Sequence, residues 1–260
     1  MGRAESNLIV LALLSGWAAS CFATGARAET SSPPNGFAYT AVATLTSDYI
    51  YRGVSQSAGN PAVQGYVEAT HKLLYAGFWA SNVDFGKQRN RAGNLQEAAN
   101  LELSPYAGIR PKWRGISFDF GVAYYAYPDS FRPGEFNYVE FDAVAEYAMF
   151  DKLTFRGVVW WSPDESTTND ELQGTEFSAS YVLKPVWIIT PTVSALIGRQ
   201  WGEGNDETYT YWNAGLTLAM SSRPALFFDV RYWDTDLEDC IDAASFQCGP
   251  RVVGSLTASF

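Results

Sequence analysis

The feature that most constrains this chain is an alternation of apolar and polar residues, repeated in segments of about ten residues between turn residues. In residues 139–147, for example, apolar side chains alternate with Glu140, Asp142 and Glu146. Because side chains in a strand alternate between two faces, each segment puts its apolar residues on one face. Beyond the N-terminal region, no window approaches the ~18 uninterrupted apolar residues of a spanning helix. If this chain crosses a membrane, it must do so as a closed β-barrel, which leaves no backbone polar group unpaired in lipid.

The pattern predicts a strand for each alternating segment. The expected strands cover residues 37–51, 62–70, 73–85, 99–109, 116–127, 137–149, 152–162, 174–183, 186–200, 208–220, 225–234 and 250–260.

The predicted connections alternate in length along the chain. They are short after the even-numbered strands, as at 70–73 and 184–185, and long after the odd-numbered strands, as at 86–98 and 234–250. Outer-membrane barrels alternate in this way, with short periplasmic turns and long external loops, whereas a soluble periplasmic β-sandwich has no reason to do so. We therefore expect an all-β fold, a single antiparallel transmembrane β-barrel of about 12 strands, over residues 37–260.

The N-terminal region is typical of a cleavable signal peptide. Arg3 precedes an apolar stretch at 8–21, and Ala26-Arg27-Ala28 matches the small-x-small cleavage pattern. We predict a signal peptide at 1–28 and a short linker at 29–36; lipoprotein processing at Cys21 is a weaker alternative. The expected location is the cell outer membrane of a Gram-negative bacterium.

Charge divides between the two ends of the predicted barrel. The chain carries a net charge of −10, which argues against a nucleic-acid partner. Basic residues gather in the short turns, and acidic residues outnumber basic ones in the long loops. We expect an acidic outer rim that contacts outer-membrane lipid and lipopolysaccharide, although ordinary solvated loop charge would give the same pattern.

Aromatic residues cluster near the predicted strand ends. Such rings often form girdles at membrane interfaces, and we expect a girdle here, with burial in a core as the alternative. The residues concerned are Tyr49, Tyr51, Trp79, Trp113, Tyr124, Tyr125, Tyr127, Trp160, Trp161, Trp187, Trp201, Tyr209, Tyr211 and Trp233.

The end of the chain resembles the terminal strand signature of outer-membrane barrels. Leu256 and Ala258 alternate with polar residues, and the chain ends on Phe260. The resemblance implies that the barrel assembly machinery recognises this strand.

Several longer strings resemble the TorF porin family, a proteobacterial family of conserved outer-membrane proteins. They are SDYIYRGVSQ at 47–56, PAVQG at 61–65, YAGFWASNVDF at 75–85, GVAYYAYP at 121–128 and NYVE at 137–140. The resemblance covers nearly the whole mature chain and implies an outer-membrane barrel with pore activity. It brings no catalytic residues.

Charged residues on the polar strand faces are predicted to line the barrel interior, since a charge facing lipid costs about 2–4 kcal/mol. The predicted pore-lining residues are Asp48, Arg52, Glu68, Glu102, Asp119, Glu140, Asp142, Glu146, Arg156, Glu176, Arg199, Asp229 and Arg231. Acids predominate in this set, which favours cations or neutral solutes. We therefore expect a porin-like channel for passive diffusion of small hydrophilic solutes. The alternative is a closed-lumen barrel that acts as a binding or structural protein through its acidic external loops.

Other candidate residues point to structure rather than chemistry. Cys240 and Cys248 are expected to form a disulfide in the last external loop. The acids at 234–242 could bind calcium but lack a regular calcium-loop spacing. His71, the only histidine, lies on a short turn, a poor position for a lipid-modifying hydrolase. We expect no enzyme activity, no metal site and no cofactor.

Overall fold

The computed structural model describes residues 36–89, 94–132, 134, 136–150, 152–165, 170–202, 208–237 and 248–260. Within these ranges, twelve strands form the wall of one barrel. They are β1 (Phe37–Thr46), β4 (Ala62–His71), β5 (Leu74–Asn82), β8 (Leu101–Ile109), β10 (Ile116–Tyr125), β11 (Tyr138–Met149), β12 (Leu153–Glu165), β13 (Asp170–Val182), β14 (Ile189–Gly202), β15 (Tyr209–Met220), β16 (Ala225–Thr235) and β17 (Arg251–Ser259).

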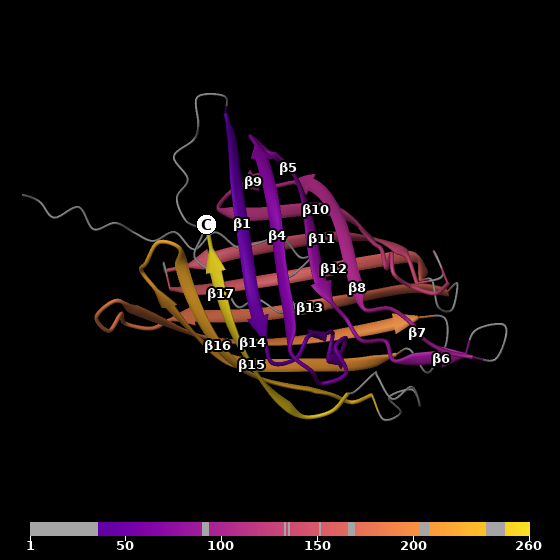
Figure 1. The fold of residues 1–260 in the computed structure, drawn as a ribbon. Helices are drawn as coiled ribbons and strands as arrows, with labels where there is room; N and C mark the ends of the chain where they lie inside the picture. The colour runs from indigo at the N-terminus through magenta and orange to yellow at the C-terminus, as the bar shows by residue number, and fades with distance from the viewer. Residues whose placement is uncertain are drawn as a thin grey trace, which may run out of the picture.

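The barrel closes by pairing the first strand with the last. β1 pairs with β4 on one side and with β17 on the other, where Val42 lies opposite Ser259. Every neighbouring pair in the wall is antiparallel, and the pairing of β10 with β11 completes the ring (Figure 1). The predicted fold class is therefore confirmed: a closed, antiparallel, 12-stranded barrel.

The two ends of the barrel differ. At one end, called the turn end, neighbouring strands are joined tightly, as β4 is to β5 through residues 72 and 73. The other end, called the loop end, carries the long connections. Among the described residues, these include the hairpin of β2 (Ile50–Tyr51) with β3 (Val54–Ser55), and that of β6 (Lys87–Arg89) with β7 (Leu95–Glu97). A further short strand, β9 (Lys112–Trp113), extends the sheet at the turn end.

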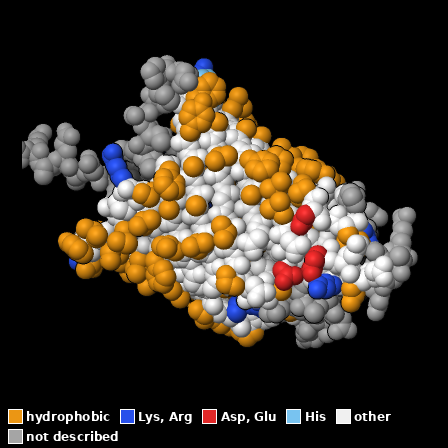
Figure 2. All heavy atoms as spheres, viewed as in Figure 1, with side chains coloured by type: hydrophobic (Ala, Val, Ile, Leu, Met, Phe, Trp, Pro, Cys, Tyr) orange, Lys and Arg blue, Asp and Glu red, His pale blue; other side chains and the backbone are white. Residues whose placement is uncertain are grey.

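The outer wall of the barrel is apolar. Along β16, Phe228, Val230 and Tyr232 are exposed, whereas Asp229 and Arg231 between them are buried. Figure 2 shows hydrophobic side chains spread over the outer surface, with charged side chains mostly toward its ends. Since a strand turns alternate residues to opposite faces, the same period that makes the wall apolar outside makes it polar inside. In the described part of the chain, no helix is long and apolar enough to span a membrane.

The predicted strand at 37–51 was wrong at its C-terminal end. β1 stops at Thr46, whose Oγ1 donates a hydrogen bond of 2.7 Å to the carbonyl of Asp48. A side chain bonded to a backbone carbonyl two residues ahead stabilises a turn. The chain therefore leaves the wall after Thr46, and this departure creates the candidate functional site.

Candidate functional site

The loop between β1 and β4, residues 47–61, folds into the barrel rather than away from it. We call it the inward loop; it can be followed from the lower end of β1 in Figure 1. Asp48, Tyr49, Ile50 and Arg52 each retain 7% or less of their exposed surface. An external loop would normally be solvated, so this burial places the loop inside the loop end of the barrel.

Asp48 anchors the base of the inward loop. Its Oδ1 accepts a hydrogen bond of 2.6 Å from Ser55 Oγ, and its Oδ2 accepts one of 2.9 Å from Arg251 Nη1 at the start of β17. Tyr49 packs its ring against Trp79 of β5, with centroids 5.5 Å apart. The start of the inward loop is thus attached to the wall on both sides of β1.

The tip of the inward loop is a tight hairpin turn. Arg52 and Gly53 connect β2 to β3 with φ angles of 49° and 83°, the combination of two positive values found in type I′ hairpin turns. Gly53 lies against the wall formed by β15 and β16, because a Cβ added there would approach Tyr211 Cβ to 2.9 Å and Thr235 Cβ to 3.1 Å. Only glycine fits without a shift at this contact.

Arg52 reaches from this tip to the opposite side of the barrel. Its two terminal nitrogens donate hydrogen bonds of 2.8 Å to the two carboxylate oxygens of Glu140 on β11. Its guanidinium carbon also lies 3.4 Å from the ring centroid of Trp160 on β12. β12 is six strands from β1 in either direction around the barrel. The inward loop therefore spans the mouth and narrows it.

Many aromatic side chains predicted for the membrane girdle lie inside the barrel instead. Trp113, Tyr124, Trp161 and Trp187 are exposed on the outer surface, as a girdle requires. Adjacent residues of a strand face opposite sides, so Trp160 points inward beside the outward Trp161. The girdle interpretation was wrong for the buried rings, which surround the inward loop or line the loop end: Tyr49, Trp79, Tyr125, Tyr127, Trp160, Tyr209, Tyr211 and Trp233.

A second arginine is paired on the wall toward the turn end. Arg110, which follows β8, donates hydrogen bonds of 2.7 and 2.8 Å to Glu68 on β4. It also donates to Asp119 on β10 over 3.0 Å, and its guanidinium carbon lies 3.7 Å from the ring centroid of Tyr75. Two acids therefore share one cation on this side of the interior.

A third arginine is held within the wall of β14, β15 and β16. Arg231 bonds to Asp229 on its own strand, to Asn213 over 2.7 Å and to Ser194 over 3.0 Å. Thr217 Oγ1 donates a further bond of 2.7 Å to Asp229. This group is satisfied internally and keeps its side chains flat against the wall.

The structure places most predicted pore-lining residues inside the barrel. Outward-facing side chains of the wall are exposed, so a buried side chain of the wall points inward. Glu146 is half-buried on the inward face of β11, directly opposite Arg156 in the register with β12. The buried members of the predicted set are Asp48, Arg52, Glu68, Glu102, Asp119, Glu140, Asp142, Arg156, Glu176, Asp229 and Arg231.

The prediction was wrong for Arg199. Its side chain is exposed and shares a face of β14 with Val193 and Ile197, which are outward-facing. In the register it lies beside the exposed Thr175 of β13, so the pleat places it on the outer wall. Its position near the loop end lets the charge lie at the membrane interface rather than in the hydrocarbon core.

Two interior cations were missed by sequence reasoning. Arg110 lies in a short turn rather than on a predicted strand, and Arg251, at the start of the predicted strand 250–260, is absent from the predicted pore-lining set. A signal for Arg251 was present, because it shares the inward face of β17 with the buried Val253. No local signal indicates that Arg110 folds back to reach Glu68 and Asp119.

Several buried polar atoms of the interior have no hydrogen-bond partner in the described part of the chain. They include both amide atoms of Gln64, Asp142 Oδ2, Arg156 Nη2 and Trp160 Nε1. Buried polar groups are normally bonded to protein or ordered water. These atoms are donors and acceptors that the described residues leave available to water or to a solute.

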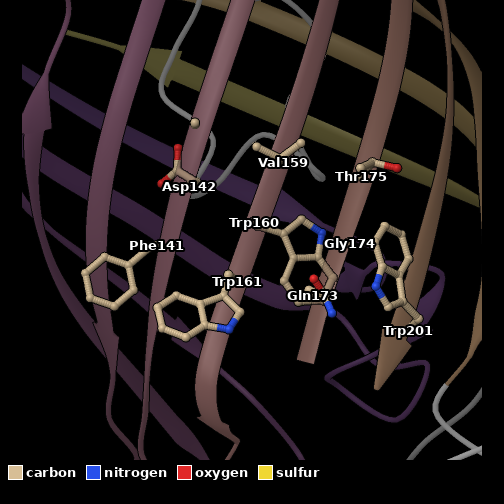
Figure 3. Close-up of a pocket in the computed structure, with 10 residues that line it drawn as sticks. Phe141, Asp142, Val159, Trp160, Trp161, Gln173, Gly174, Thr175 and Trp201 are labelled. Atoms are coloured by element: carbon tan, nitrogen blue, oxygen red, sulfur yellow. The ribbon is translucent and has the colours of Figure 1, made fainter. Parts of the chain in front are cut away.

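The outer wall carries a groove of about 360 Å³ near the loop end. Figure 3 shows Phe141 and Trp161 on one side and Trp201 on the other, with Trp160 and Gly174 between them. Phe141 and Trp161 stack with their centroids 5.6 Å apart and are exposed. The exposed part of the groove lining, which includes Phe141, Val159 and Trp161, faces the surroundings of the barrel.

The remaining candidate residues lie apart from the mouth. His71 Nδ1 is 3.1 Å from the carbonyl oxygen of Gly36, and its ring packs against Phe37 at the turn end. Cys248 is disulfide-bonded; Cys240, its expected partner, and most of the acidic segment 234–242 lie outside the described residues. Among the described residues, no group of three or more His, Cys, Asp or Glu side chains is arranged to hold a metal ion.

Comparisons with known proteins agree with this architecture. A family model, Gcw_chp, described as a bacterial protein of unknown function, matches residues 27–260. No curated protein sequence matches the chain. The solved structure of the NanC porin superposes with a TM-score of 0.51 at 8% identity, over 86% of this chain and 99% of that one. An outer-membrane channel from Pseudomonas putida F1 gives a TM-score of 0.46 at 12% identity, over 88% and 99%. The first likeness establishes a porin-like barrel fold of the kind found in outer membranes.

Proposed function

Since the chain belongs to the Gcw_chp family of bacterial proteins of unknown function, we propose a role from its own geometry: a narrow outer-membrane channel for passive diffusion of small hydrophilic solutes. The observation that carries this proposal is the combination of a polar interior, in which some donors and acceptors are unpaired among the described residues, with a loop that narrows one mouth. The narrower resemblance to the TorF porin family stays a prediction that is consistent with this role.

The size of the barrel supports a restricted path. Eight-stranded barrels are filled by side chains, whereas barrels of 16–18 strands leave a wide aqueous channel. Twelve strands lie between these cases, and the inward loop further reduces the free cross-section at the loop end. We expect low unitary conductance and exclusion of large solutes.

The charge of the interior favours cations or neutral solutes over anions. Each of Arg52, Arg110, Arg231 and Arg251 is paired with at least one carboxylate. Glu102, Glu176 and Asp142, by contrast, form no ion pair within the described residues and are buried on the inward face. An excess of acids along a narrow path lowers the energy of a permeating cation.

The alternative function is a closed barrel that binds partners through its acidic external loops. The paired arginines favour it, because side chains that neutralise one another can also fill a lumen. The two functions differ in a single property, the presence of a continuous path for ions.

Contact with outer-membrane lipid is part of the proposal. The exposed Arg199 lies on the outer wall close to the groove between Trp161 and Trp201. An arginine beside aromatic rings suits the phosphate and acyl portions of lipopolysaccharide. Phe260, which bonds to Ala41 across the closing strand pair, is exposed at the terminus that the barrel assembly machinery would recognise.

Planar-bilayer recording of the purified, folded protein tests the function. Stepwise currents in potassium chloride, with reversal potentials that favour potassium over chloride, are expected for the channel. A folded protein that inserts but never conducts supports the closed barrel instead. Liposome swelling with solutes of graded size then measures the cutoff.

A further inference from the structure

The inward loop carries a cation, Arg52, which occupies a ready-made site on the opposite wall. We infer that this mouth site, made of Glu140, Trp160 and Asp142, binds planar cations of the guanidinium class, and that Arg52 fills it when no such solute is present. This inference rests on the proposed channel function, because a solute reaches the site through the loop end.

The contacts of Arg52 define what the mouth site recognises. Glu140 accepts two parallel hydrogen bonds of 2.8 Å from the guanidinium, the fork geometry that carboxylates form with this group. The indole of Trp160 lies 3.4 Å from the guanidinium carbon, and the ring of Tyr51 on the loop lies 4.4 Å from it. A planar, weakly hydrated cation gains from both contacts, whereas a compact, strongly hydrated ion gains little from stacking.

The recognising groups belong to the wall and the bound group belongs to the loop. Glu140 and Trp160 lie on β11 and β12, neighbouring strands held by a continuous antiparallel register. Gly174 on β13 leaves room for the indole, since a Cβ there would come within 2.6 Å of three Trp160 ring atoms. The site is therefore preorganised by rigid strands, and it persists when the loop moves away.

Asp142 gives the mouth site a second carboxylate. It lies directly opposite Trp160 in the register of β11 with β12, and it is buried with 9% of its surface exposed. Its Oδ2 has no hydrogen-bond partner among the described residues, and neither has Trp160 Nε1. Arg52 leaves this acceptor unused, so a solute that carries additional N–H donors finds a further partner there.

The tip and the base of the inward loop are held by separate contacts. Arg52 itself has a φ of 49°, a left-handed conformation that costs a non-glycine residue free energy. The base of the loop is held separately, by Asp48 with Ser55 and Arg251. Tyr51 and Gly53 also contact the wall, at Tyr125 and Tyr211. Losing the contacts of Arg52 therefore loosens the tip while the base stays attached.

Free guanidinium competes with Arg52, which is tethered to the loop, and this competition sets the concentration at which guanidinium acts. A group on a short loop acts at an effective concentration of roughly millimolar or above, so free guanidinium should act at about 1–50 mM, well below denaturing concentrations. When Arg52 is removed, the apparent affinity of the mouth site for free guanidinium rises by the factor by which Arg52 had lowered it.

The test compares variants in planar bilayers, with guanidinium chloride added against sodium chloride at equal ionic strength. The half-effect concentration of guanidinium on the potassium current is measured for wild type and Arg52→Ala. We expect the half-effect concentration to be lower by about tenfold or more in Arg52→Ala than in wild type. Adding Trp160→Leu to Arg52→Ala should reverse this gain, whereas Trp161→Leu, which changes the neighbouring outward ring, should not.

A second readout does not depend on conduction. Proteinase K cleavage within residues 50–55, followed by mass spectrometry, reports release of the tip in detergent-folded wild-type protein. Guanidinium should accelerate this cleavage, and sodium should not. Equal half-effect concentrations in wild type and Arg52→Ala, or equal effects of sodium and guanidinium on cleavage, would overturn the inference. If no variant conducts but guanidinium still releases the tip, the channel function fails and the mouth site stands.

Discussion

Asp48 and Arg251, which are 203 residues apart in the sequence, form an ion pair of 2.9 Å between the inward loop and the strand that closes the barrel. The side chain of Asp48 retains 8% of its exposed surface and that of Arg251 retains 17%. One carboxylate thus attaches the loop to the last strand of the chain, and the position of the loop depends on completion of the barrel.

Asp48→Asn should loosen the base of the inward loop. The variant keeps the shape of the side chain but removes the charge that Arg251 and Ser55 contact. These partly buried donors then lack a matching acceptor, which should lower the stability of the protein by roughly 1–3 kcal/mol. We expect faster proteolysis within residues 47–61 and larger current fluctuations in bilayers. Glu97→Gln is the matched control, because its pair with Lys87 is exposed at both ends. Equal behaviour of the two variants would contradict the anchoring role.

Gly53→Ala should displace the tip of the inward loop. The added methyl would meet Tyr211 and Thr235, and it would also carry the cost of a positive φ, roughly 1–2 kcal/mol. Gly115→Ala separates the two effects, because Gly115 has nearly the same φ, 82°, and open space around it. We expect the unitary conductance to change only in Gly53→Ala. Both variants should lose a similar amount of stability, because both place alanine at a positive φ. An unchanged conductance in Gly53→Ala would mean that the tip does not narrow the path.

Arg231→Met should destabilise the barrel by roughly 3–5 kcal/mol, because it leaves the Asp229 carboxylate buried without its cation. The double variant Arg231→Met/Asp229→Asn removes that charge as well and should recover much of the loss. The loss is measured as the urea midpoint of unfolding in detergent micelles. A double variant no more stable than the single one would show that the lost side-chain packing, rather than the unpaired charge, dominates.

Arg156 and Arg199 differ in which side of the wall they face, and their substitutions should differ accordingly. Arg156→Gln removes an interior cation and should shift the reversal potential in a potassium chloride gradient toward greater cation preference. Arg199→Gln removes a charge from the outer surface and should leave the reversal potential unchanged. It should instead reduce the lipopolysaccharide that co-purifies with the protein, which phosphate analysis measures. A shift in reversal potential with Arg199→Gln would mean that this charge acts on the lumen.

The alternation of residues predicted the barrel well and the mouth poorly. Inside each strand, a period of two decides which side chains share a face, so Glu140 and Asp142 could be assigned to the interior from the pattern alone. The prediction misplaced Arg199, because it assigned this residue by its charge, although the period of two puts Arg199 on the same face of β14 as Val193 and Ile197. It also assigned Trp79 and Trp233 to a girdle, because an aromatic ring near a strand end suits either side of the wall.

The inward loop shows where pattern reasoning stops. Residues 47–51 continue the alternation of β1, and nothing in their spacing indicates that the strand ends at Thr46. The turn depends on Asp48, whose partner Arg251 comes from the other end of the chain. A contact over such a separation leaves no periodic trace in the sequence.

The closed antiparallel barrel, its strand number and the polar character of its interior could be predicted, because they follow from local alternation and from the cost of unpaired backbone in lipid. The inward turn of the first long loop, the pairing of Arg52 with Glu140 and its stacking on Trp160, and the partners of the other interior arginines emerge only in the folded barrel. The contact of Arg52 with Glu140 joins the inward loop to a strand on the opposite side of the ring, so it depends on the whole barrel rather than on any one segment.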